Sequence, residues 1–79
     1  MKVVVQLFGP LAEQAGASRL EVTVVRMTVG DVVSAASAAA PALRIDRSVR
    51  FALNTDYVEL SAPVGEGDVV SLIPPVGGG

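Results

Sequence analysis

The sequence predicts an α+β domain in which a mixed β-sheet packs on one main helix. Short apolar runs with period-two alternation recur along the chain, as expected for half-buried strands. One longer segment, residues 28–40, instead has apolar residues at helical spacing. No repeat or linker divides residues 20–73. We therefore expect a single domain over residues 1–79, with a globular part over residues 1–73 and a tail over residues 74–79.

The N-terminal quarter predicts a strand, a short helix and a second strand. Residues 2–8 are apolar with polar residues at even positions, which is the period of a strand. Pro10 suits the first position of a helix and Gly16 suits its end, so we expect one or two helical turns over residues 11–15. Residues 19–25 predict a strand that pairs with the first as a hairpin-like unit.

The main helix has a predicted start, face and end. Thr28 and Asp31 resemble a capping box, with Thr28 as N-cap and Asp31 near the positive end of the helix dipole. Pro41 cannot continue the helix, which therefore ends before it. Residues 41–49 are expected to form a loop. The predicted apolar face consists of Val29, Val32, Val33, Ala36 and Ala40.

The C-terminal part predicts three further strands. Residues 50–54 and 57–60 are short strands on either side of a turn centred on Asn54-Thr55-Asp56. Residues 63–67 form a connection broken by glycines. Residues 68–73 are the last strand.

Composition excludes several classes of function. The chain has no cysteine and no histidine, so it has no thiolate nucleophile, disulfide or iron–sulfur ligation, and we expect no metal site. A net charge of −2 and only three aromatic residues argue against nucleic-acid binding. No apolar run reaches the ~20 residues of a membrane span or has the form of a secretory signal. We therefore expect a cytoplasmic protein that binds no membrane.

Strand alternation predicts which apolar residues lie outside the core. The core side of the first, fourth and last strands is assigned to Val3, Val5, Leu7, Val58, Leu60, Val70 and Leu72. The opposite face carries Lys2, Val4, Gln6, Glu59 and Ser71. Phe8, Tyr57 and Ile73 share this solvated face, which indicates a surface for a partner protein. The alternative is that these three lie at strand ends under loops, because singly exposed apolar residues are common.

Other polar groups predict no catalytic site. Arg44, Arg47 and Arg50 form a basic loop, but Asp46 lies among them, so a solvated loop is the simpler interpretation. The glycines of residues 65–67 lack the spacing of a phosphate-binding loop and no Walker-type lysine follows them.

The last six residues, Pro74-Pro75-Val76-Gly77-Gly78-Gly79, suggest a chemical role for the chain's own terminus. A glycine run has no side chains to pack and is narrow enough to enter another protein's channel. The Gly79 carboxylate is ionised and a poor electrophile, so it would need activation as a mixed anhydride, for instance by adenylation with ATP. Because the chain has no nucleotide-binding motif, another enzyme would activate it. The alternatives are an inert terminus or a cloning remnant.

These residues resemble the molybdopterin synthase small subunit, the MoaD family of ubiquitin-like sulfur carriers. The similar features are the Asn54 hairpin, Gly67-Asp68 before the last strand, and the Pro-Pro-Val-x-Gly-Gly ending. The opening Phe8-Gly9-Pro10 with Gly16 also resembles that family. Gly77 departs from the pattern, because a larger residue such as threonine often occupies this position.

The resemblance implies a β-grasp fold and a division of labour between proteins. An E1-like enzyme would adenylate Gly79 with ATP, and a sulfur donor such as a cysteine desulfurase or rhodanese would supply the thiocarboxylate sulfur. The chain itself would bind no cofactor. It would act as a subunit of molybdopterin synthase, a heterotetramer, by inserting Pro75, Val76 and the glycines into the large subunit. Phe8, Tyr57, Ile73 and Pro74 match the family's docking surface.

Three alternatives remain open from the sequence. The sulfur could serve the synthesis of thiamine or cysteine, or the thiolation of tRNA. The same activated Gly79 could be joined to lysines, as in ubiquitin-like protein modifiers. Finally, the chain could be a non-covalent adaptor with an inert tail.

Overall fold

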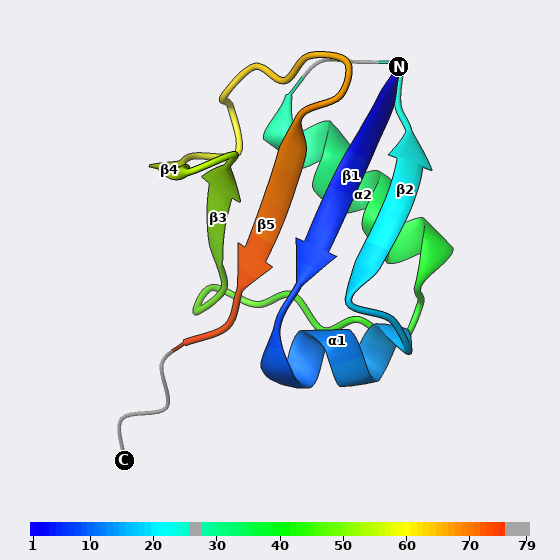
Figure 1. Cartoon of the computed structure of the whole chain (residues 1–79). Helices are drawn as coiled ribbons and strands as arrows, with labels where there is room; N and C mark the ends of the chain where they lie inside the picture. Colours follow the sequence, from blue (N-terminus) through cyan, green and yellow to red (C-terminus); the bar gives the residue numbers. More distant parts are fainter. Residues whose placement is uncertain (26–27, 76–79) are drawn as a thin grey trace.

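The computed structural model describes residues 1–25 and 28–75 of the chain (Figure 1). The predicted order of strands and helices is confirmed, and only the bounds differ. The elements are β1 (Lys2–Leu7), α1 (Gly9–Ala15), β2 (Arg19–Thr23), α2 (Val29–Ala39), β3 (Arg50–Leu53), β4 (Asp56–Val58) and β5 (Val69–Ile73).

The strands form one mixed sheet in the order β2-β1-β5-β3-β4. The central strands β1 and β5 run parallel, and every other pair is antiparallel. In Figure 1, α2 lies behind the sheet, the other face is uncovered, and α1 lies at the end where β1 and β5 finish. This arrangement leaves one face of the sheet for the core and one for contacts outside the domain. The fold is the predicted α+β class.

The core lies between α2 and the sheet. Alternation in β1 is confirmed, because Val3, Val5 and Leu7 are buried. The buried residues of the core are all small or branched aliphatic residues, which suits the close approach of an alanine-rich helix to a sheet. The largest fully buried side chains are Leu7, Leu72, Val3, Val5, Val29, Val32 and Val70.

Helix α2 begins and ends as the sequence predicts, whereas α1 ends as predicted but begins earlier, at Gly9. The Thr28 hydroxyl accepts from the Asp31 amide at 3.3 Å, and the Thr28 amide donates to the Asp31 carboxylate at 3.2 Å, which completes the capping box. Helix α2 ends at Ala39, before Pro41. Helix α1 ends at Ala15 and is capped by Gly16, whose φ of 75° places it in the left-handed region that glycine adopts without strain.

Several predicted bounds need correction. Strand β2 ends at Thr23, two residues before the predicted end, and Phe8 is the N-cap of α1 rather than the last residue of β1. Strand β4 begins and ends earlier than predicted, at Asp56 and Val58. The chain therefore leaves the sheet before Leu60. Its side chain, which alternation had assigned to the core, is 48% exposed.

Candidate functional site

The uncovered sheet face has a register that places its side chains in rows across the strands. Gln6 on β1 pairs with Ser71 on β5, which pairs with Ala52 on β3, which pairs with Tyr57 on β4. Paired residues in a sheet point to the same face. Tyr57 therefore lies on the predicted face, and its side chain is 68% exposed.

Phe8, Ile73 and Pro74 meet at the end of this face where β5 finishes. Leu7 at the end of β1 pairs with Leu72, so Phe8 and Ile73 are the next residues of the two neighbouring segments. Phe8 has an extended backbone, and its ring is 43% exposed on the face opposite the buried Leu7. A Cβ on Gly9 would lie 3.7 Å from Cγ of Pro74, so the start of α1 contacts the residue after β5. Ile73 and Pro74 are half-buried.

Tyr57 lies apart from this cluster. Strand β3 separates β4 from β5, so Tyr57 and Ile73 are about two strand spacings, or ~10 Å, apart. Arg50 pairs with Ile73 and lies diagonally from Tyr57, so a cation stands between the two apolar residues. The prediction that these residues share one face agrees with the register. They form an apolar end cluster and a separate tyrosine rather than one continuous patch.

The prediction that Ser71 is solvated was wrong, because this residue is only 6% exposed. Its place on the outer face was predicted correctly, but β5 is central and both neighbouring strands cover a side chain this small. Ala52 beside it is also buried. The sequence prediction also missed Val69, half-buried beside Val4 on the same face. Alternation along β5 could have found it, because Val69 has the same parity as Ser71.

Hydrogen bonds of the Asn54 and Asp68 side chains fix the start of β5. They therefore also fix the position at which this strand ends. The Asn54 side-chain oxygen accepts from the Val69 amide at 3.1 Å, while its NH₂ donates to the Asp68 carboxylate at 3.4 Å. The other Asp68 oxygen accepts from the Gly65 amide at 2.8 Å. The asparagine and the aspartate on which the family resemblance partly depends are therefore structural in this chain. They tie β5 to the β3–β4 turn and to the preceding loop.

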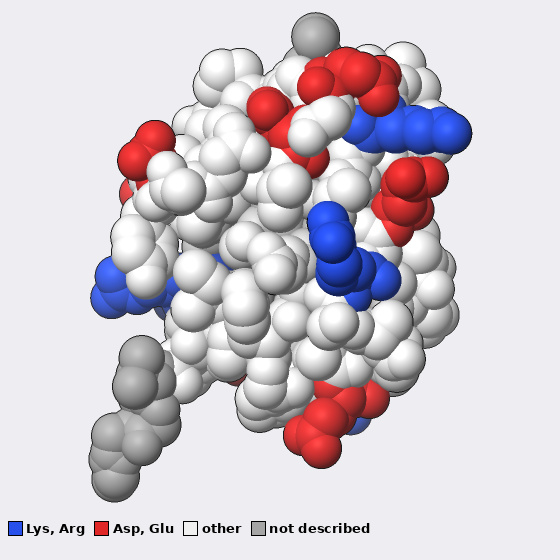
Figure 2. Space-filling view, in the orientation of Figure 1, with Lys and Arg blue, Asp and Glu red and all other residues white. Residues whose placement is uncertain are grey.

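Charge is distributed unevenly over this face. Figure 2 shows most charged side chains around its margin and one basic side chain nearer the centre, with uncharged residues over most of the remaining area. A largely uncharged surface with charges at its rim is typical of protein interfaces. Away from this face, hydrogen bonds from the Ser48 hydroxyl and then its amide lower the pKa of Asp46. The Asp46 carboxylate therefore stabilises the turn over residues 46–48 by accepting both hydrogen bonds.

The reactive end predicted from the sequence falls beyond what can be described. Val76, Gly77, Gly78 and Gly79 lie outside the described residues, and Pro75, the last one inside, is exposed. Within residues 1–25 and 28–75, no His, Cys, Asp and Glu side chains gather into a group that could hold a metal ion. No helix in the same ranges is long and apolar enough to cross a membrane.

A five-stranded mixed sheet with parallel central strands, grasping one helix, defines a β-grasp domain of the ubiquitin-like type. A family model described as the ThiS family matches residues 5–79, which is nearly the whole chain. The chain belongs to the ThiS family and is a ubiquitin-like sulfur carrier or modifier.

Solved structures agree with this assignment. SAMP1 from Haloferax volcanii is 30% identical, with full coverage of both chains and a TM-score of 0.91. A putative molybdopterin converting factor subunit 1 from Pyrococcus furiosus is 26% identical over 95% of this chain and 98% of its own, with a TM-score of 0.82. The complex of subunits 1 and 2 of molybdopterin-converting factor from Helicobacter pylori contains a chain 27% identical, with full coverage of both chains and a TM-score of 0.73.

Proposed function

We propose that this chain is a sulfur carrier for molybdenum-cofactor synthesis and that the Gly79 carboxylate is its reacting group. The observation that carries the proposal is the position of Phe8, Ile73 and Pro74. They form a partly exposed apolar cluster on the uncovered face, at the point where β5 ends and the tail begins. A partner that docks on this cluster would receive the tail at the same time. The match to the family model, which extends to Gly79, supports the same role for the tail.

The chemistry divides between the chain and its partners. A carboxylate oxygen of Gly79 attacks the α-phosphorus of ATP in an E1-like enzyme, releasing pyrophosphate and forming an acyl adenylate. A sulfur nucleophile from a cysteine desulfurase or rhodanese then displaces AMP at the carbonyl carbon. If the nucleophile is a persulfide, a thiol reductant cleaves the resulting acyl disulfide to the thiocarboxylate. This chain contributes the carboxyl group and the docking face.

The proposal also specifies the pathway that receives the sulfur, which is molybdopterin synthesis. It is supported by the Pro-Pro-Val-x-Gly-Gly ending and by the similarity to molybdopterin converting factor subunits, one of them in complex with its subunit 2. The acceptor would be the large subunit of molybdopterin synthase in a heterotetramer. There two thiocarboxylate sulfurs become the dithiolene of molybdopterin.

Intact-mass spectrometry tests the carrier role directly. The chain is co-expressed with the E1-like enzyme of its own organism, and we expect the mass difference of one sulfur-for-oxygen exchange. A variant without Gly78 and Gly79 should fold and remain unmodified, whereas the Glu13→Gln variant, altered on exposed α1, should be modified like the parent. A parent that forms neither adenylate nor thiocarboxylate with any such enzyme would contradict the proposal.

The acceptor is tested separately with the thiocarboxylated chain. Incubation with the large subunit and its unsulfurated precursor should yield molybdopterin. Transfer instead to a thiamine, cysteine or tRNA acceptor would keep the carrier role and reassign the pathway.

A second candidate, a protein modifier, is favoured by one comparison. The archaeal modifier protein SAMP1 is similar over its full length. In that role the activated Gly79 would form an isopeptide bond with lysine amines of target proteins. Expression of an N-terminally tagged chain in its own host should then give conjugates of higher mass that disappear when Gly79 is deleted. Detection of the free chain alone would remove this candidate.

A further inference from the structure

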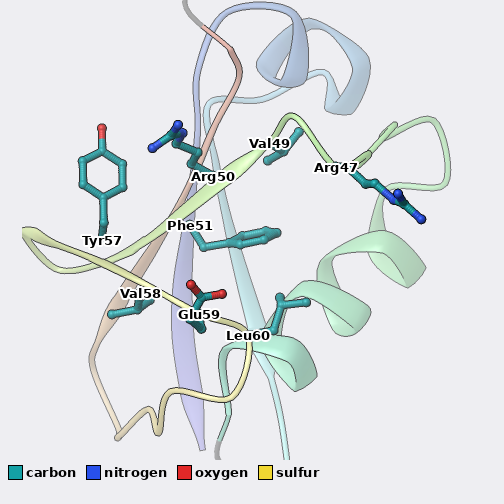
Figure 3. A pocket seen from close by; sticks show the side chains of 8 residues that line it. All are labelled: Arg47, Val49, Arg50, Phe51, Tyr57, Val58, Glu59 and Leu60. Atoms are coloured by element: carbon teal, nitrogen blue, oxygen red, sulfur yellow. The ribbon is translucent and has the colours of Figure 1, made fainter.

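A groove of about 480 Å³ lies beside the edge strand β4 and plays no part in the function proposed above. Figure 3 shows Phe51 and Leu60 on its inner side toward α2, and Arg50 and Tyr57 extending together on the other side. The groove is therefore apolar on its inner side and is otherwise lined by polar and charged side chains, Glu59 among them. We call it the β4 groove, and its principal lining residues are Arg50, Phe51, Tyr57, Val58, Glu59 and Leu60.

The groove exists because β4 is too short to cover β3. The pairing of the two strands runs from Leu53 with Asp56 to Phe51 with Val58 and stops there. Arg50 pairs with Ile73 of β5 on one side, but within the described residues it has no strand partner on the other. An edge left open in this way is a site at which an extended peptide can lie alongside a sheet.

Leu60 is exposed although its backbone is held in place. Its carbonyl accepts from the Gly30 amide at the start of α2 at 2.9 Å, and a Cβ on Gly30 would lie 3.4 Å from that oxygen. The Ala62 carbonyl likewise accepts from the Val29 amide at 2.9 Å. The 48% exposure of Leu60 is therefore a property of the fold rather than of a loose loop. A fixed apolar side chain loses little backbone freedom when a partner covers it.

The charge of the groove is opposite to that of the chain. Arg47 lines it together with Arg50, and Glu59 is the only acidic residue in the lining, which leaves a local charge of +1 on a chain of net charge −2. Neither guanidinium donates any of the side-chain hydrogen bonds found among the described residues. The nearby Asp46 carboxylate is engaged by Ser48. The arginines are thus available to a carboxylate from outside.

We propose that the β4 groove binds an extended segment of a partner protein in which apolar residues alternate with acidic ones. An apolar side chain of the segment lies on Phe51, Val58 and Leu60, and a neighbouring carboxylate accepts from Arg50. This is a second contact surface, which would let a partner hold the carrier without covering Phe8. Tyr57 lines the groove, and Arg50 lies between it and Ile73.

Amide shifts in a ¹⁵N NMR titration test this proposal on the full-length, unactivated chain. The probe is the blocked hexapeptide acetyl-Asp-Val-Asp-Leu-Asp-Val-amide, and its counterpart has lysine at each aspartate. We expect saturable shifts within residues 49–51 and 57–60 for the acidic peptide only. The Arg50→Gln variant should bind on the order of tenfold more weakly, as expected for a lost charge-assisted hydrogen bond.

Matched variants and other outcomes complete the test. Arg44→Gln changes an arginine of the loop that precedes β3; this residue does not line the groove, so the variant should bind as the parent does. Leu60→Ser should weaken binding without moving the shifts elsewhere. No saturable shift, equal binding of the lysine peptide, or shifts confined to Gln6 and Ser71 on the outer face would each overturn the proposal. None of these results bears on thiocarboxylate formation, so failure here leaves the proposed function standing.

Discussion

Asn54 and Asp68 fix the start of β5, the strand whose other end leads into the tail. The Asn54 NH₂ donates to the Asp68 carboxylate while its oxygen accepts from the next amide, that of Val69. The Asn54 amide also donates to the Val69 carbonyl at 2.8 Å. Asn54 is therefore hydrogen-bonded to both the amide and the carbonyl of Val69, the first residue of β5. This fixes the register that brings Ile73 beside Phe8.

Substitutions of Asn54 should separate two contributions to stability: the hydrogen bonds of its side chain and the strain of its positive φ. Asn54 has a φ of 56°, where most side chains are strained. We expect Asn54→Gly to lose the side-chain bonds alone, at a cost of about 1–3 kcal/mol in the free energy of unfolding. Asn54→Ala should cost about 1 kcal/mol more, because it adds the strain of a positive φ. Urea unfolding measures both, with Thr55→Ala in the same turn as control. Equal stability of the two variants would mean that strain plays no part.

Gly9 and Gly16 should respond to alanine alike. Both have a positive φ, 52° and 75°, and a Cβ would meet nothing closer than 3.7 Å at Gly9 and nothing within 4 Å at Gly16. The penalty should therefore come from backbone conformation, at about 1 kcal/mol for each variant. Thermal unfolding compares the two. A much larger loss for Gly9→Ala would show that the contact with Pro74 leaves no room for a methyl group.

Phe8 should contribute to docking and little to stability. Its ring is partly exposed at the end of the uncovered face, so Phe8→Ala should weaken binding of the activating enzyme by about 1–3 kcal/mol. Calorimetry measures this affinity. The Val25→Ala variant removes an apolar side chain that is almost fully exposed and lies outside the docking cluster, and it should bind normally. Unchanged affinity for Phe8→Ala would return Phe8 to a structural role.

The turn of Asp46 gives a prediction about pH. Ser48 lowers the pKa of Asp46, first through its hydroxyl and then through its amide. Because the folded pKa lies below the unfolded one, this stabilisation is present above the unfolded value and is lost as the pH falls through the folded value. Ser48→Ala should raise the pKa of Asp46 toward its ordinary value, as followed by carboxyl NMR titration. An unchanged titration would exclude the hydroxyl as the main cause.

Local signals predicted the helices and the first strand well. The Thr28–Asp31 capping box and the stop before Pro41 depend on neighbouring residues, and both are present. Alternation predicted the faces of β1, because a strand with one buried side repeats its pattern over its whole length. The parallel pairing of β1 with β5 had no local signal. The family resemblance implied a β-grasp fold, but this pairing was not predicted as such.

Leu60 and Ser71 show where alternation failed and why. The pattern of Tyr57 to Leu60 continues that of a strand, but the chain leaves the sheet after Val58 because its backbone bonds to the start of α2. That contact joins residues thirty positions apart, so no local pattern records it. Ser71 was assigned to the correct face, but its burial depends on the central place of β5 in the strand order. The β4 groove was missed for the same reason as Leu60.

The parallel pairing of β1 with β5 also governs when the domain can form during synthesis. Because the final strand lies in the middle of the sheet, β1 has no neighbour on one side, and β3 and β4 have no link to it, until residues 69–73 have been translated. A ribosome-bound chain that lacks this strand cannot close its core. An enzyme that recognises the folded surface would therefore not bind chains in which residues 69–73 are missing.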